Sequence, residues 1–102
     1  MFLEKLLDDY SYQLLLEKYG YNVINDINRN NFLSIYKLLK NNKFYFINDI
    51  VVNYFEIFKL DYDIILESIE RLKDNNVNYI EDVCNNMCLL IDIINDVLED
   101  SL

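Results

Sequence analysis

Residues 78–98, NYIEDVCNNMCLLIDIINDVL, carry the most regular apolar pattern of the chain. Apolar side chains recur along this stretch at intervals of three and four residues, which is the spacing of one face of an α-helix. Asn78 and Glu81 at its start have the form of a capping box, with Asn in place of Ser or Thr. The stretch therefore predicts either one long helix or two shorter helices separated near Asn85 and Asn86.

The same helical spacing recurs at four places earlier in the chain. The segments run from Leu3 to Leu14 with Gly20 as a natural stop, from Phe32 to Leu39, from Ile47 to Leu60, and from Ile65 to Leu72 behind a cap at Asp61 or Asp63. The third segment is apolar nearly all round, which predicts the most buried helix. A strand over Phe44–Ile47 is the alternative, since aromatic and β-branched residues favour strands, but the helical period continues through it. We therefore expect an all-α protein, a compact single-domain bundle of five or six helices that covers residues 1–102.

A faint internal repeat runs through the chain. The segments Leu15–Ile27, Leu38–Ile50 and Arg71–Val83 resemble one another, and the second and third lie 33 residues apart, near the period of short helical repeats. The first and second lie only 23 residues apart. The pattern predicts a fold built from degenerate helical repeats, with chance similarity among Asn, Asp and Ile as the alternative.

The residue usage is strongly biased. The 102 residues include no Ala, Pro, Thr, His or Trp and a single Gly, whereas Asn, Ile, Leu, Asp and Tyr abound. Ala, Pro and Thr codons require G or C, while Asn, Ile and Tyr codons are rich in A and T. The bias therefore predicts an AT-rich gene, from a virus, a phage or a low-GC bacterium.

No membrane segment or export signal is expected. The longest uninterrupted apolar run, Met87–Ile91, falls far short of the ~20 residues that span a bilayer. The start, Met1–Lys5, lacks a basic segment followed by an apolar one, which argues against a secretory signal. We therefore expect a cytoplasmic protein, in the host cytoplasm if the gene is viral.

Few residues are suited to catalysis. Without His there is no imidazole base and no ordinary zinc or haem site, and a single Gly cannot build a phosphate-binding loop. The four serines lack the Gly-rich turn of a hydrolase nucleophile. We therefore expect a protein that is not an enzyme and uses no cofactor.

Carboxylates alone offer one metal-binding alternative. Asp63, Glu67 and Glu70 fall at i, i+4 and i+7 and share one helical face, which would suit a divalent cation. A solvated helix face explains them better, and Asp63 lies near a helix N-terminus, where the dipole favours an acid. No metal site is therefore predicted.

Two cysteines, Cys84 and Cys88, lie four residues apart on the last apolar stripe. Two thiolates without further Cys or His do not complete a structural zinc site. A disulfide within a regular helix would need the two side chains to converge, and a cytoplasmic chain is kept reduced. We therefore expect two buried thiols that fill core positions.

Charge is unevenly distributed along the chain. Between Ile27 and Asn48 there is no acid, and Arg29, Lys37, Lys40 and Lys43 give that stretch a net charge of +4. The last 29 residues contain no base and carry a net charge of −7. The candidate partner-binding residues are the acids of this end: Glu81, Asp82, Asp92, Asp96, Glu99 and Asp100.

These acids predict a protein partner with a basic surface, such as a nucleic-acid-binding protein whose phosphate track they occupy. A net charge of −9 argues against direct binding of nucleic acid, and no membrane partner is expected. An ordinary solvated acidic face is the alternative, because like charges four apart destabilise a helix by only a few tenths of a kcal/mol.

Aromatic residues are numerous for so small a core. Nine Tyr and six Phe predict that some rings remain at the surface, where they anchor protein interfaces. A homodimer and a monomer are both compatible with the apolar stripe of residues 78–98. The function expected is a protein-interaction module of viral or mobile-element origin that binds and modulates or inhibits a host protein. The alternative is a structural or assembly subunit that acts as a homo-oligomer.

Overall fold

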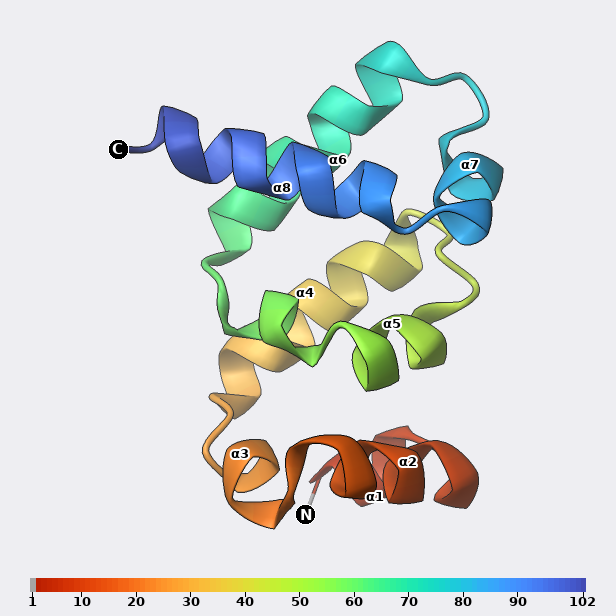
Figure 1. Cartoon of the computed structure of the whole chain (residues 1–102), viewed down its shortest axis with the longest axis vertical. Coiled ribbons are helices and arrows are strands. Elements are labelled where there is room, and N and C mark those ends of the chain that lie inside the picture. The colour runs from red at the N-terminus through yellow and green to blue at the C-terminus, as the bar shows by residue number, and fades with distance from the viewer. Residues whose placement is uncertain (1) are drawn as a thin grey trace. The chain divides into compact units, whose positions relative to one another are not determined.

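The computed structural model describes residues 2–102, which form α-helices, one 3-10 helix and connecting turns, without a strand (Figure 1). The all-α prediction is confirmed. The chain divides into two compact units, one up to Lys59 and one from Leu60 to Leu102. The prediction of a single domain stays a prediction.

The N-terminal unit contains five α-helices and the 3-10 helix. They are α1 (Phe2–Leu6), α2 (Asp9–Tyr19), α3 (Tyr21–Asn25), α4 (Arg29–Asn41), α5 (Ile47–Asn53) and η1 (Phe55–Lys59). The C-terminal unit contains α6 (Tyr62–Asn75), α7 (Tyr79–Asn85) and α8 (Cys88–Asp100). The described residues thus form eight α-helices instead of the five or six expected.

The extra helices arise where predicted helices break and at α3, which follows the expected stop at Gly20 in a stretch where no helix is predicted. The segment from Leu3 onward divides at Asp8, whose extended backbone (φ −68°, ψ 164°) caps α2. The segment from Ile47 to Leu60 divides at Tyr54 (φ −135°, ψ 43°), so that the expected central helix is α5 followed by η1. Residues 78–98 divide at Asn86 (φ −150°, ψ 92°), which is the two-helix alternative.

The cap at Asp8 is a hydrogen bond whose strength depends on pH through the ionisation of the Asp8 carboxyl. Its Oδ1 accepts a hydrogen bond from the Ser11 amide at 2.7 Å, which satisfies one of the unpaired amides at the start of α2. Hydrogen bonding to Ser11, first to its side chain and then to its backbone, lowers the pKa of the Asp8 carboxyl below its ordinary value of 3.8. The ionised carboxylate is therefore the form that the folded chain prefers.

Replacing Asp8 by Ala should destabilise the chain at neutral pH and matter less in acid. A lowered folded-state pKa contributes stability above the ordinary pKa, and that stability is lost as pH falls through the folded-state value. The urea midpoints of the native chain and Asp8→Ala should thus differ at pH 7 and converge well below pH 3.8. Asp9→Ala, which removes the exposed neighbouring carboxylate, is the control. A gap between the native chain and Asp8→Ala that stays constant across the titration would contradict the assigned cap.

Phe32 of α4 lies at the centre of the aromatic core of the N-terminal unit. Its ring is fully buried and stacks on Phe58 with 4.5 Å between ring centroids. Phe2, Phe55 and Tyr36 surround it at centroid distances of 5.5, 6.0 and 6.1 Å. One face of α4 therefore holds the first helix and η1 in place through a single side chain.

Polar contacts join α2 to the segment that follows α5. The Tyr19 hydroxyl donates to Glu56 Oε2 at 3.1 Å, and Lys18 Nζ donates to the Asn53 carbonyl at 3.4 Å. Asn31 Nδ2 donates to the Phe58 carbonyl at 2.9 Å and so ties the start of α4 to η1. The Lys18 bond satisfies the carbonyl of Asn53 at the end of α5, and the Asn31 bond satisfies the carbonyl of Phe58 near the end of η1.

The C-terminal unit is built on the packing of α6 against α8 (Figure 1). Both helices bury one apolar face and expose a polar one. The buried side chains are Ile65, Ile69 and Leu72 of α6, Val83 of α7, and Leu90, Ile94 and Val97 of α8. Asp92, Asp96 and Glu99 of α8 therefore project from the side of the helix that faces away from α6.

The three similar sequence segments occupy similar places in their helices. Leu15–Ile27, Leu38–Ile50 and Arg71–Val83 each run from the last turns of a longer helix into a shorter one. The repeat itself stays a prediction.

No helix among residues 2–102 has the length and apolar character needed to cross a bilayer.

Candidate interaction surface

The net charge of the chain resides in its C-terminal unit. Up to Lys59 there are seven acidic and seven basic side chains. Leu60–Leu102 carries eleven acidic and two basic ones, so the formal net charge of −9 is that of this unit alone. The sequence predicts that the last third of the chain is acidic. The C-terminal unit begins at Leu60, so it also contains the acids of α6.

One face of α8 is lined with carboxylates. Asp92, Asp96 and Glu99 lie at i, i+4 and i+7, and all three are exposed on the side opposite the apolar face that packs on α6. Within residues 2–102 none of the three forms an ion pair. Because carboxylates one turn apart repel each other, a cation bound across them relieves that repulsion. The α8 face, defined as these three residues, is suited to bind a basic surface.

Asp100 lies off the α8 face and is already paired. Arg71 Nη2 donates to Asp100 Oδ2 at 2.8 Å, and Arg71 Nε donates to Glu67 Oε1 at 3.1 Å. The two carboxylates, Asp100 first, raise the pKa of the Arg71 guanidinium above its ordinary value. Asp100 therefore ties the end of α8 to α6, and its charge is partly neutralised within the unit.

Glu81 and Asp82 lie on a different helix, in the first turn of α7. Glu81 is exposed and Asp82 is half-buried. Acids in a first turn stabilise the positive end of the helix dipole, which is a structural reason for both residues. Asn78 takes the N-cap position, as predicted, although its side chain caps no amide. Of the six predicted residues, the structure thus gathers three on the α8 face and places two on a separate helix.

Cys84 and Cys88 are exposed, so the predicted core role of both is wrong. Cys88 lies four residues before Asp92 and therefore shares the exposed side of α8, away from the buried Leu90 and Ile94. Cys84 lies on α7 beside the buried Val83 and is itself exposed. Both are thiols, as predicted.

The metal-binding alternative finds no support in the geometry. In the described part of the chain, no three His, Cys, Asp or Glu side chains lie close enough together to hold a metal ion. Asp63, Glu67 and Glu70 are exposed on α6, and Glu67 is engaged by Arg71.

Some aromatic residues are exposed, and in the described part of the chain all of these exposed aromatic residues are tyrosines. The exposed tyrosines are Tyr10, Tyr21 and Tyr45 in the N-terminal unit and Tyr62 in the C-terminal unit. The prediction that some rings remain at the surface is confirmed. The acids and most of the exposed tyrosines, however, belong to different units, so only Tyr62 shares a unit with the α8 face.

Arg71 is the residue supporting this surface that reasoning from sequence missed. Its pairing with Glu67 had a signal, because Glu four residues before Arg is the favourable order on a helix. Its contact with Asp100 had no such signal, since that contact depends on how α6 packs on α8.

Comparison with known proteins gives no match to a family model, to a curated protein or to a solved structure.

Proposed function

We propose that the chain is a non-enzymatic protein-interaction module whose α8 face binds a basic surface of a partner protein. The observation that carries the proposal is the concentration of the whole net charge of −9 in the C-terminal unit, with three exposed carboxylates on one helix. Such a field attracts a basic protein at long range and repels nucleic acid and anionic lipid surfaces. Arg71 supports the surface by fixing the end of α8 on α6.

Binding to a basic surface also implies how the module acts. A partner whose basic side chains lie on the carboxylates of α8 can no longer offer them to phosphate groups. The AT-rich residue usage fits a viral or mobile-element gene, so the partner proposed is a host protein in the cytoplasm that the module inhibits or redirects. The repeat of Leu15–Ile27, Leu38–Ile50 and Arg71–Val83 belongs to the same proposal: a small helical scaffold extended by duplication.

Replacing Asp92, Asp96 and Glu99 by Lys should abolish capture of the partner. The change converts three attractive contacts into three repulsive ones and lowers the on-rate as well as the affinity. Affinity capture from host lysate, read by mass spectrometry, should enrich proteins with the native chain that the triple variant fails to retain. Raising the salt concentration should weaken the same capture, because exposed charges are screened.

A matched control changes the net charge equally on the other unit. Glu17, Asp26 and Asp49 are exposed acids of the N-terminal unit, and replacing all three by Lys should leave the capture intact. Equal loss with both triple variants would contradict a site on α8 and indicate unspecific attraction. Sedimentation of the same proteins addresses the homo-oligomer alternative: an assembly subunit would form a stable oligomer at low micromolar concentration without any partner.

A further inference from the structure

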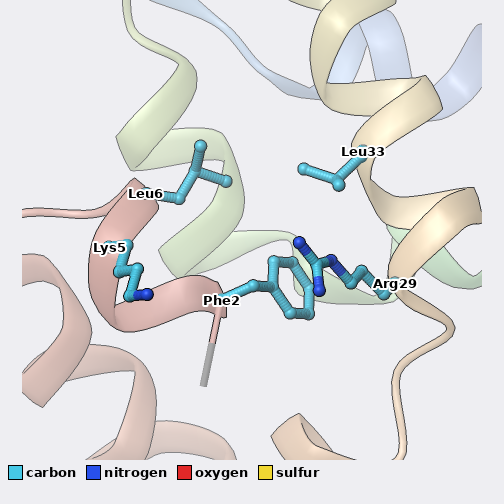
Figure 2. Close-up of a pocket in the computed structure, with 5 residues that line it drawn as sticks. All are labelled: Phe2, Lys5, Leu6, Arg29 and Leu33. Atoms are coloured by element: carbon cyan, nitrogen blue, oxygen red, sulfur yellow. The ribbon is translucent and has the colours of Figure 1, made fainter.

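A shallow hollow of about 220 Å³ opens between α1 and α4 in the N-terminal unit. Figure 2 shows its two walls, formed by Phe2, Lys5 and Leu6 from α1 and by Arg29 and Leu33 from α4. The Phe2 ring packs edge-on against the buried Phe32, and the Arg29 guanidinium lies over it at 5.6 Å from the ring centroid. The hollow therefore has apolar walls and a positively charged rim.

The positive charge continues from the hollow along α4. Arg29, Leu33, Lys37 and Lys40 lie at i, i+4, i+8 and i+11 and share the solvent side of the helix. No acid interrupts residues 27–48. We call the hollow together with Lys37 and Lys40 the α1–α4 groove.

The cations of this groove are not used within the described chain. In residues 2–102, none of Lys5, Arg29, Lys37 and Lys40 forms an ion pair. Arg29 lies over the Phe2 ring, and Lys40 Nζ lies 6.0 Å from the Tyr36 ring centroid. A cation held by an aromatic face keeps its donors available for an anion. The unit that carries the groove is neutral overall, so its acids do not outweigh this stretch.

The volume of the hollow limits what can enter it. Sites that enclose a drug-sized ligand have volumes of roughly 300–1,000 Å³. A hollow of about 220 Å³ is smaller and has room for one large apolar side chain. The row of cations from Arg29 to Lys40 extends over about three turns of α4, the length of a short helix laid alongside. Size and charge together favour a peptide over a free metabolite.

We propose that the α1–α4 groove binds an acidic helical segment of a partner protein. One apolar side chain of the segment fills the hollow against Phe2 and Leu33, and its carboxylates bind Arg29, Lys37 and Lys40. This is the helix-in-groove mode of recognition, with charge complementarity setting the register. The groove and the α8 face thus accept partners of opposite charge on different units of one chain.

A synthetic peptide tests the groove directly. The probe is a fluorescent helical peptide of about twelve residues that begins with one Leu and has a Glu at about every fourth position after that Leu. A second peptide has the same residues in the reversed order. Fluorescence anisotropy should show saturable binding by one of the two orders. The binding should weaken as salt rises and should be lost when the Leu of the peptide becomes Ser or its Glu residues become Gln.

Variants of the chain locate the binding. Arg29→Glu and Lys37→Glu should each weaken the peptide at least about fivefold, since each removes one exposed ion pair and adds a repulsion. Lys59→Glu makes the same charge change at an exposed position of η1 and should leave the affinity unchanged. Leu33→Ala should weaken binding of the Leu peptide, because it removes part of the apolar wall against which that Leu packs.

Three results would overturn the proposal. They are absence of binding up to millimolar peptide, equal binding of the Leu and Ser peptides, and an equal effect of Lys59→Glu and Arg29→Glu. Sedimentation without peptide supplies a fourth: a dimer of the native chain that Arg29→Glu dissociates would assign the groove to a second copy of the chain.

Discussion

Replacing Phe32 by Ala should strongly destabilise the N-terminal unit. The side chain is fully buried, and removing it leaves a cavity bounded by the rings of Phe2, Phe55 and Phe58. Truncation of a buried Phe costs about 3–5 kcal/mol, a cost that includes the lost contacts with the neighbouring rings. Since whole domains are stable by only about 5–15 kcal/mol, this one change removes a large share of the free energy of unfolding.

Urea unfolding followed by circular dichroism measures that loss. Tyr10→Ala is the matched control, because Tyr10 is an aromatic residue of the same unit whose side chain is 73% exposed. Its effect should stay within about 0.5 kcal/mol. If both variants shifted the midpoint equally, the aromatic contacts around Phe32 would not be the centre of this core.

The helices that sequence predicts best are those whose ends also carry a signal. The segment from Ile65 to Leu72 lies within α6, with Asp61 at the N-cap, and Phe32–Leu39 lies within α4, capped by Asn28. In both, a helical period and a cap residue agree, so local preference and tertiary packing select the same structure.

The breaks were predictable only in part. Asp8 is a good N-cap residue, so the division before α2 had a local signal. The break at Tyr54 had no local signal in the sequence. Its backbone leaves the helical region in a stretch without Gly or Pro, and the apolar residues on every side of this stretch predict a continuous helix. η1 instead brings Phe55 and Phe58 onto Phe32, a gain that depends on residues far away in the chain.

The candidate site shows the same limit. The shared face of Asp92, Asp96 and Glu99 follows from spacing within one helix, and the structure has it. The engagement of Asp100 depends on its contact with Arg71 of α6. It cannot be derived from periodicity, because the packing of α6 on α8 sets it. The exposure of Cys88 follows from periodicity, since it lies four residues before Asp92 on the same helix.

Replacing Ile94 by Asp should unfold the C-terminal unit and remove the α8 face with it. Ile94 is 3% exposed on the apolar side of α8, where this helix packs on α6. A carboxylate placed there has no cation to pair with, and burying an unpaired charge costs several kcal/mol, about 4 or more. Thermal unfolding should lose the helical signal of α6 and α8 together, because each buries its apolar face on the other.

Asn95→Asp is the control one residue along the same helix. It makes the same change in charge at an exposed position beside Asp96, so the unit should stay folded. Because it extends the α8 face, it should strengthen capture of a basic partner where Ile94→Asp abolishes it. Equal stability of the two variants would mean that α8 does not rest on α6. Equal capture by both variants would mean that an unfolded acidic segment binds the partner as well as the folded face does. Partner binding would then depend only on the charge of the unit.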